Sequence, residues 1–368
     1  MFRLKKTSKK GVRIGVLKTT HGLLKTPFYM PDATRGFVKL TNNDDIKKTG
    51  TSAMVVNTFH LYLQPGLKII KKAGGLHKFM NWTGPLLSDS GGFQVFSLIH
   101  KNKQMGKITD EQVLFKSPLD GSWHELSPEK SIQIQFDLGV DMMVCLDDCP
   151  PNEFSRSDLE RAVNRTIAWA KRCKLEYNRQ IKKRHLKDSK RPLLFSVIQG
   201  GAEIDLRKYC ASELVKIGFD GYGFGARPID ASGNFLSEVL RKTAEYIPVE
   251  SLRFALGIGT PEDIYRCAKL GWDMFDCVIP TREGRHGKLF LPLAGNKHKT
   301  ININNAKFAN DLSPINKSSH LALLNSYSRA YLHHLFKLNE PLGHNLASLN
   351  NLEFYQRLAN SLEKQDLK

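Results

Sequence analysis

Short apolar segments recur along the chain, and each one ends in polar or glycine residues. Segments of this length that are apolar throughout are typical of strands buried on both faces, as in parallel sheets. Helical patterns lie between them, and the alternation of strand and helix predicts a parallel α/β fold. The predicted strands are residues 53–60, 85–92, 141–148, 193–201, 221–226, 253–259 and 274–279.

Three helices are predicted with recognisable ends or faces. Ser127 followed by Pro128 has the pattern of an N-cap and a first helical residue, and this helix should end near Gly139. The segment from Thr260 to Asp263 resembles a capping box, which opens a second helix. The third helix carries apolar residues at helical spacing, namely Leu159, Val163, Ile167 and Ala170.

Polar residues stand at the C-terminal end of every predicted strand. A TIM barrel places its active site at that end of all eight strands. A doubly wound sheet does so too, but usually with a glycine-rich phosphate turn early in the chain. The glycine clusters here match neither G-x-G-x-x-G nor the P-loop pattern. We therefore expect a TIM (β/α)8 barrel.

The composition indicates what kind of partner the protein binds and in which compartment it acts. The chain has 368 residues and a formal net charge of +19, which favours a polyanionic partner over an indifferent basic surface. Its six scattered cysteines form no Cys-x-x-Cys pair, which suits a reducing compartment without a disulfide framework. No apolar run approaches the roughly 18 residues of a membrane span, and the basic N-terminus lacks a signal-peptide core. We expect a cytoplasmic protein.

Four polar residues converge if the barrel is right. A carboxylate can attack the anomeric carbon of a sugar while a second one acts as acid and base. Arginines close to the nucleophile can clamp the phosphates of a nucleic acid, as Arg282 and Arg285 would. These observations predict chemistry on a nucleoside inside RNA or DNA. The four residues are Asp89, Asp147, Gln199 and Asp276.

Each candidate also has a plainer explanation. An aspartate after a strand is often only a helix N-cap, and glycines often only make a tight turn. Phe93 and Leu256 are more often plain core than a pair that stacks on a base. His333 and His334 are adjacent and do not share a helix face, which argues against a metal pair. Local spacing alone therefore leaves each residue open.

Several longer motifs occur together and in a fixed order. They are Ser88-Asp-Ser-Gly-Gly-Phe-Gln-Val-Phe-Ser-Leu98, Val197-Ile-Gln-Gly-Gly201, Leu256-Gly-Ile-Gly-Thr-Pro261, Asp273-Met-Phe-Asp-Cys-Val-Ile-Pro-Thr-Arg282 and Tyr327-Ser-Arg-Ala-Tyr-Leu-His-His-Leu335. In these motifs the chain resembles the tRNA-guanine transglycosylases, also called queuine tRNA-ribosyltransferases, over about residues 26–355.

The resemblance implies a fold and an activity. The fold is one TIM-barrel domain over residues 1–368, with a small N-terminal antiparallel sheet (about 1–30) and a C-terminal helical subdomain (about 300–352). The activity is exchange of guanine at the wobble position of tRNA-Asp, -Asn, -His and -Tyr, which have GUN anticodons. The incoming base of bacterial members is 7-aminomethyl-7-deazaguanine, a queuosine precursor. No nucleotide cofactor is implied.

The resemblance also implies a role for individual residues. Asp276 aligns with the nucleophile that attacks ribose C1′, and Asp89 aligns with the general acid/base. Phe93 and Leu256 align with the residues that sandwich the base. Arg282 and Arg285 align with contacts to the tRNA backbone. The residues implied to bind the substrate base are Asp147, Gln199, Gly225, Ala226, Ser90 and Cys149.

The chain departs from the family at its zinc site. The family's three cysteines and one histidine fall here at Ser319, Leu321, Leu324 and Asn350. Zinc needs thiolate or imidazole ligands, so we predict a subdomain without zinc, in which Leu321, Leu323 and Leu324 form an apolar cluster. Bacterial relatives are homodimers whose interface lies near this subdomain, so a homodimer is an expectation with weaker support.

A second departure concerns the incoming base. Ala226 replaces a glycine of the family, and Arg227 and Pro228 replace a leucine and an alanine beside the substituent of the deazaguanine. A cation there would oppose a protonated aminomethyl group, so queuine is an alternative substrate. A non-catalytic tRNA-binding subunit is a further alternative, against which the retained aspartates and Gln199 argue. A transglycosylase that acts on archaeal tRNA or on DNA is a third.

Overall fold

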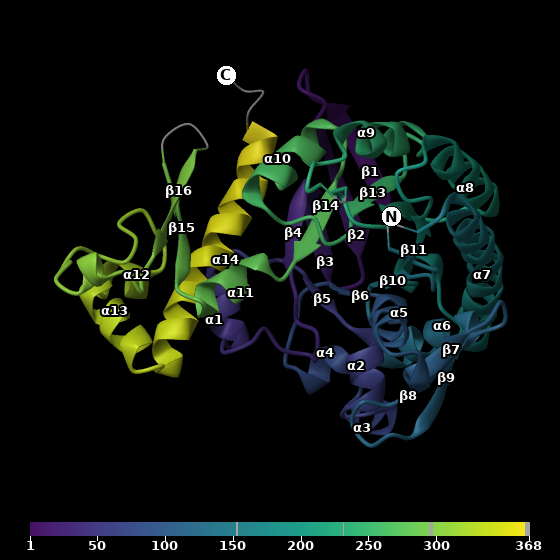
Figure 1. Ribbon diagram of the computed structural model, residues 1–368, viewed down its shortest axis with the longest axis horizontal. Helices are drawn as coiled ribbons and strands as arrows, with labels where there is room; N and C mark the ends of the chain where they lie inside the picture. The colour runs from purple at the N-terminus through teal and green to yellow at the C-terminus, as the bar shows by residue number, and fades with distance from the viewer. Residues whose placement is uncertain (152–153, 231, 294–296, 365–368) are drawn as a thin grey trace.

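Eight parallel strands form the centre of the molecule (Figure 1). The computed structural model describes residues 1–151, 154–230, 232–293 and 297–364. The strands follow one another around the sheet in the order β4-β14-β13-β12-β11-β10-β6-β5. They are β4 (Phe28–Pro31), β5 (Met54–Val56), β6 (Leu86–Ser88), β10 (Met142–Val144), β11 (Leu193–Ile198), β12 (Gly221–Phe224), β13 (Leu252–Ala255) and β14 (Met274–Cys277).

The two end strands of this sheet meet and close it into a barrel. The Ala33 N–H donates to the Val55 carbonyl over 2.7 Å, and Asp32 forms a parallel bridge to Val55. The predicted TIM barrel is therefore confirmed. Seven of its strands overlap predicted segments. The strand β4 was not predicted, because its apolar residues 28–30 are set between Pro27 and Pro31 and proline is atypical of strand interiors.

Helices cover the outside of the barrel, and the three predicted ones are confirmed. Ser127 caps α6 by accepting the Lys130 N–H over 3.1 Å, and Gly139 ends it at φ 73°. Thr260 caps α10 in the same way. The helices before the C-terminal subdomain are α1 (Asn43–Lys48), α2 (Thr58–Leu63), α3 (Leu67–Lys72), α4 (Leu76–Phe79), α5 (Gly92–Lys101), α6 (Pro128–Leu138), α7 (Arg156–Lys183), α8 (Ile204–Ile217), α9 (Ser237–Glu245), α10 (Pro261–Lys269) and α11 (Ile279–Arg285).

Two small antiparallel sheets are added to the barrel. The predicted N-terminal sheet consists of β1 (Phe2–Thr7), β2 (Arg13–Thr19) and β3 (Gly22–Thr26). Leu17 and Leu24 from this sheet pack among the side chains of the barrel interior. The second sheet follows α5 and was not predicted from the sequence. It consists of β7 (Gly106–Ile108), β8 (Val113–Lys116) and β9 (Trp123–Leu126).

One buried carboxylate fastens the N-terminal sheet to the barrel. Asp141 lies just before β10 and accepts the N–H of Leu86 at the start of β6 over 3.0 Å. The backbone N–H of His21, in the turn between β2 and β3, reaches the same carboxylate over 3.0 Å. The rings of His21 and His77 stack 3.7 Å apart and both contact Asp141. The N-terminal end of the barrel is thereby covered, and the C-terminal end is left for ligands.

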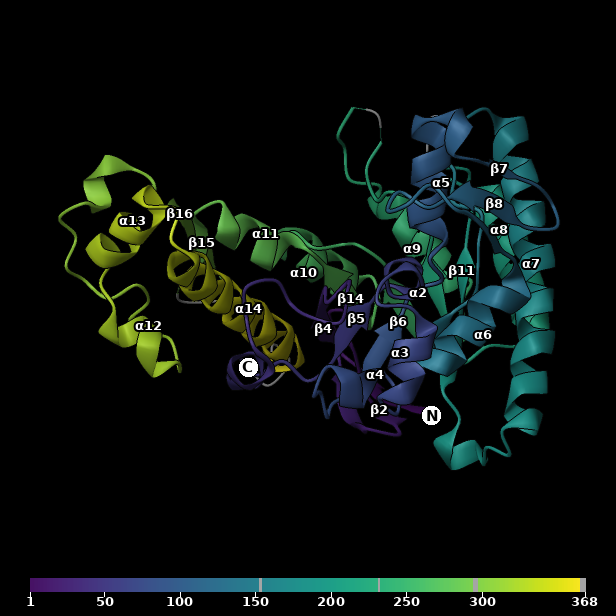
Figure 2. The ribbon, with the colours of Figure 1, turned by 90° about the horizontal axis from the view of Figure 1, so that it is seen from below.

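The C-terminal subdomain extends to one side of the barrel (Figure 2). Its long helix α14 runs from the subdomain back to the barrel and packs against α11, where the Asn351 amide donates to the Pro280 carbonyl over 2.9 Å. Among the described residues, no helix has the length and apolar character needed to cross a membrane. The elements of the subdomain are β15 (Lys288–Pro292), β16 (His298–Asn302), α12 (Ala322–Ser326), α13 (Arg329–Lys337) and α14 (Pro341–Lys364).

The four positions that the resemblance assigned to zinc do not fit that metal. Ser319 donates its hydroxyl to Glu353, and Asn350 accepts from the amide of Asn316 over 2.9 Å. Leu321 and Leu324 are buried in the apolar cluster of the subdomain, with Leu323 packed against it, so the predicted apolar cluster is confirmed. A hydroxyl, an amide and two leucines supply neither thiolate nor imidazole.

Candidate active site

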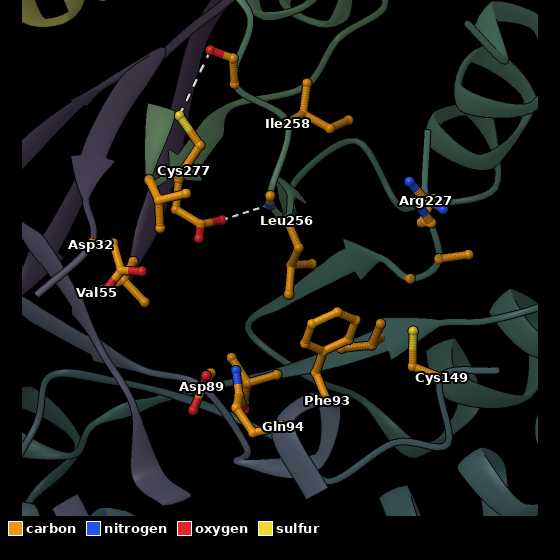
Figure 3. A pocket seen from close by; sticks show the side chains of 18 of the residues that line it. Asp32, Val55, Asp89, Phe93, Gln94, Cys149, Arg227, Leu256, Ile258 and Cys277 are labelled. Carbon is orange, nitrogen blue, oxygen red and sulfur yellow. Dashed lines mark hydrogen bonds between the residues drawn. The ribbon is translucent and has the colours of Figure 1, made fainter. Parts of the chain in front are cut away.

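A cavity of about 1140 Å³ opens at the C-terminal end of the barrel strands. Its wall contains most of the residues singled out from the sequence (Figure 3). Gln199 and Arg285 are the two that are not part of this wall. The predicted residues that line the cavity are Asp89, Ser90, Phe93, Asp147, Cys149, Gly225, Ala226, Leu256, Asp276 and Arg282.

Asp276 projects from β14 into this cavity. One of its oxygens accepts the N–H of Gly257 over 2.8 Å, which holds the carboxylate in place. The other oxygen has no hydrogen bond within the described ranges. Burial raises the pKa of Asp276 to about 7, the Gly257 N–H opposes this rise, and the negative charge of Asp32 adds to it. An oriented carboxylate with one free oxygen is suited to act as a nucleophile.

Asp89 lies directly after β6 in the same cavity. The Asn57 side chain donates to one oxygen over 2.5 Å, and two backbone N–H groups donate to the other. Burial is the main cause that raises the pKa of Asp89 to about 7; the two backbone N–H groups oppose this rise, and the charges of Asp32 and Asp276 contribute to it. A carboxyl group that titrates near neutral pH can both donate and accept a proton, as an acid/base catalyst must.

Asp147 and Gln199 form a pair at another part of the cavity. The Gln199 amide donates to Asp147 over 2.6 Å, and burial raises the pKa of Asp147 to about 7. Gln199 lies directly behind the wall, and its Oε1 is buried with no hydrogen-bond partner among the residues that the structure describes. Buried acceptors are normally paired. In this structure the oxygen is closed off from the cavity, so an N–H donor of a ligand such as a purine would reach it only after the Gln199 side chain moves.

The backbone at Gly225 and Ala226 completes this part of the wall. Gly225 has no side chain at a point where a Cβ would lie 2.3 Å from the Gln199 amide nitrogen. Arg207 is fully buried beneath the wall and donates to the carbonyls of Gly225 over 2.8 Å and Gly201 over 2.7 Å. Burial raises the pKa of Cys149, which also lines the cavity, to about 12, so its thiol is neutral.

Phe93 and Leu256 face each other across the cavity (Figure 3). Phe93 comes from α5 and is 62% exposed, so it is not part of the core. Leu256 follows β13 and is partly buried against the barrel interior. An exposed ring opposite an aliphatic side chain is the arrangement needed to hold a flat base, as the resemblance implied.

The two arginines lie at different depths. Arg282 lines the cavity, where it pairs with Glu283 over 3.4 Å. Burial lowers the pKa of Arg285, and the neighbouring Arg282 lowers it further, while the charge of Asp32 opposes this. Arg285 is therefore within electrostatic range of the cavity without lining it.

One group in the described part of the chain has the side chains for a metal site. It consists of His21, His77 and Asp141, whose ligand atoms lie within 4.8 Å of one another. This group lies at the opposite end of the barrel, and its polar atoms already bond to each other and to backbone groups. It fastens the fold and takes no part in the cavity.

Several residues of the site were not identified from the sequence. Asp32 lines the cavity but follows β4, the strand that was missed; recognising that strand would have drawn attention to it. Asn57 directly follows β5 but lies inside the longer segment predicted as a strand, residues 53–60, so it did not stand out as a residue at a strand end. Gly257 acts through its own backbone N–H, and Arg207 donates to backbone carbonyls. No residue pattern signals such roles.

The model of the family described as queuine tRNA-ribosyltransferase matches residues 8–365. The chain belongs to this family. Three similar proteins are named queuine tRNA-ribosyltransferase. The one from Thermoanaerobacter pseudethanolicus is 41% identical over 96% of this chain and 90% of its own. The one from Caldanaerobacter subterraneus subsp. tengcongensis is 42% identical over 98% and 92%. The one from Staphylococcus aureus (strain bovine RF122 / ET3-1) is 39% identical over 98% and 90%.

Membership of this family establishes the class of reaction. Queuine tRNA-ribosyltransferases are glycosyltransferases of tRNA, so this chain is a transferase that acts on tRNA by transglycosylation. The cavity agrees with that class, because it combines two oriented carboxylates with a place for a flat base.

Gly225→Ala should damage the base site while the barrel still folds. The new Cβ would overlap the Gln199 amide and displace it from Asp147. Loss of one buried polar contact corresponds to a rise in KM for guanine of about 10- to 100-fold in a base-exchange assay.

Gly121→Ala is the matched control, because it adds the same methyl group where nothing lies within 4 Å. It should leave KM unchanged, although its φ of 74° should cost about 1 kcal/mol of unfolding free energy. An unchanged KM for Gly225→Ala would show that the pair Asp147 and Gln199 does not recognise the base.

Proposed function

We propose that the protein replaces guanine at the wobble position of tRNAs with GUN anticodons by a deazaguanine. The observation that carries this proposal is that Asp276 and Asp89 share one cavity with Asp147, which is paired with Gln199 directly behind the wall. The first two supply bond-breaking chemistry, and the second two supply recognition of a purine. The tRNAs for Asp, Asn, His and Tyr carry such anticodons, as the family resemblance implies.

The reaction proceeds in two displacements at ribose C1′. The free oxygen of Asp276 attacks C1′, the bond from C1′ to guanine breaks, and Asp89 supplies the proton that the departing guanine takes. The incoming base then gives a proton to Asp89 and attacks C1′, which releases Asp276. Each half forms one bond and breaks a similar one, so no nucleotide cofactor is required.

The raised pKa values suit this sequence of protonation states. Asp276 must be ionised when it attacks, and Asp89 must be protonated at the same moment. Burial brings the pKa of both groups to about 7, and the charge of an ionised Asp276 raises the pKa of Asp89, which favours a state in which Asp276 is ionised and Asp89 holds the proton. Asp89 accepts from two backbone N–H groups and an amide, which keeps it oriented in both states.

The covalent intermediate also requires protection from water. Hydrolysis of the bond between Asp276 and C1′ would leave an abasic tRNA. A base held between Phe93 and Leu256 would occupy the space beside C1′, and apolar residues such as Val55 and Val197 form the wall around it. The base must leave the anticodon stack to reach this depth.

Asp276→Asn should abolish the covalent tRNA adduct that the original protein forms on a denaturing gel. We expect tRNA affinity to change by less than about threefold, because the phosphate contacts that dominate affinity are untouched. Incorporation of labelled guanine into unmodified tRNA-Asp should fall to background. Asp137→Asn, which removes a carboxylate paired with Lys71 and Arg184 outside the cavity, is the control and should retain both activities.

Two results would contradict this assignment. A persistent adduct with Asp276→Asn would place the nucleophile elsewhere. A folded protein that binds tRNA but incorporates no guanine would favour the alternative of a non-catalytic tRNA-binding subunit.

The proposed incoming base is 7-aminomethyl-7-deazaguanine, with queuine as the alternative. Ala226, Arg227 and Pro228 line the cavity beyond the base site, where a substituent of the base would lie. We expect a higher kcat/KM for the aminomethyl base when both are compared side by side. Arg227→Leu should raise it by a further factor of about 3 to 10, because one positive charge near the ammonium group is removed. A strong preference for queuine would overturn this choice.

We also infer that the C-terminal subdomain folds without zinc. Its support is the hydroxyl, amide and leucine side chains at the four family positions. Metal analysis of the purified protein should find no zinc at this site, and a chelator should leave the thermal unfolding midpoint unchanged. About one zinc per chain, removed by a chelator with loss of the fold, would refute this. We also propose that the protein forms a homodimer, as the resemblance implies.

A further inference from the structure

Asp32 is a third carboxylate at the reacting end of the cavity, and the mechanism above gives it no role. It directly follows β4, which pairs with β14 so that Met30 lies opposite Asp276. In Figure 3, Asp32 lies on the side of the cavity opposite to Cys149 and Arg227. Asp32 therefore stands beyond the nucleophile, away from the part of the wall where a substituent of the base would lie.

The carboxylate of Asp32 is only half satisfied. One oxygen accepts the backbone N–H of Thr34 over 2.6 Å and also the hydroxyl of Thr34. Its other oxygen has no hydrogen bond, and its carboxylate no ion pair, among the residues that the structure covers. Its negative charge raises the pKa of both Asp276 and Asp89, so Asp32 does not stabilise the ionised form of either group. A carboxylate that lines the cavity with one oxygen unused points to a donor on the substrate.

Among the groups of a nucleotide, the 2′-hydroxyl of the sugar is the candidate for that donor. In the proposed reaction the base is held between Phe93 and Leu256, which Figure 3 shows between Asp32 on one side and Cys149 and Arg227 on the other. Phosphates are anions and would be repelled by a carboxylate. The sugar hydroxyls are neutral donors, and the 2′-hydroxyl is attached to the carbon next to C1′. A group that flanks the nucleophile can therefore reach the 2′-hydroxyl.

We propose that Asp32 accepts a hydrogen bond from the 2′-hydroxyl of the nucleotide whose base is exchanged, and so makes the enzyme specific for RNA. This inference rests on the proposed base exchange and adds the sugar to what the site recognises. The 2′-hydroxyl is the group by which a protein distinguishes RNA from DNA at a given position. In glycosyl transfer, hydrogen bonds to the neighbouring hydroxyl also strengthen in the transition state.

The test compares two RNA stem-loops that differ in one oxygen. Both carry a tRNA-Asp anticodon, and one has 2′-deoxyguanosine at the wobble position. For the original protein, kcat/KM for labelled-guanine exchange should be at least about tenfold higher with the ribose substrate, since a hydrogen bond to a charged acceptor is lost. For Asp32→Val, the ratio of the two kcat/KM values should fall to within about twofold of one.

A purely electrostatic role for Asp32 gives a different result. Asp32→Asn keeps the shape and an acceptor oxygen but removes the charge, and so lowers the pKa of Asp276 and Asp89. The acidic limb of the pH profile should then move to lower pH equally for both stem-loops. The other charged or titratable groups that sense Asp32 are Arg285 and His60, the latter also sensing Arg35. If Asp32→Val shifts the profile but leaves the ratio unchanged, the inference is wrong.

Binding measurements separate this inference from failure of the proposed reaction. If the original protein exchanges no guanine, the proposed function fails, but the sugar contact can still be measured. Affinities of Asp276→Asn and Asp276→Asn/Asp32→Val for both stem-loops should show a ribose preference only when Asp32 is present. Equal affinities of Asp276→Asn for the two stem-loops would overturn the inference. Asp137→Asn, outside the cavity, should leave every ratio unchanged.

Discussion

The site depends on buried carboxylates that form no ion pair with any residue the structure describes. Asp89, Asp147 and Asp276 accept hydrogen bonds from amides and backbone N–H groups, and burial raises the pKa of each to about 7. The other end of the barrel shows the opposite arrangement. There Asp141 is surrounded by two imidazoles and two N–H groups, and its pKa is lowered. The same residue type therefore fastens one end of the barrel and lines the cavity, with a raised pKa, at the other.

Neutral groups hold the reactive carboxylates in place. Asn57 and Gly257 orient Asp89 and Asp276 without supplying a full positive charge, which would lock both in the ionised state. The guanidinium of Arg207 lies beneath the wall and donates to the backbone carbonyls of Gly225 and Gly201. Its hydrogen bonds stabilise the backbone that shapes the wall. The carboxyl groups of the cavity remain the groups that can gain or lose a proton near neutral pH.

The sequence predicted the barrel and most of the site for one reason: parallel strands that are buried on both faces end at a common rim. That rule located Asp89, Asp147 and Asp276, and the family resemblance assigned their roles. It failed for β4, whose four residues carry no distinctive pattern, and Asp32 was missed with it. The sheet formed by β7, β8 and β9 is inserted between α5 and α6, and no periodicity in the sequence predicts it. Raised pKa values and contacts to backbone carbonyls depend on distant segments, so they require coordinates.

The closure of the barrel has a consequence for how the chain is made. β4 is among the first segments to leave the ribosome, yet its register partner is β14, with Phe28 opposite Met274. Local pairs such as β1 with β2 can form early, whereas this pair must wait for most of the polypeptide. The edge of β4 that pairs with β14 stays open during that interval, which exposes it to other chains. The barrel wall and the position of Asp276 on β14 are thus completed in a single late event of biosynthesis.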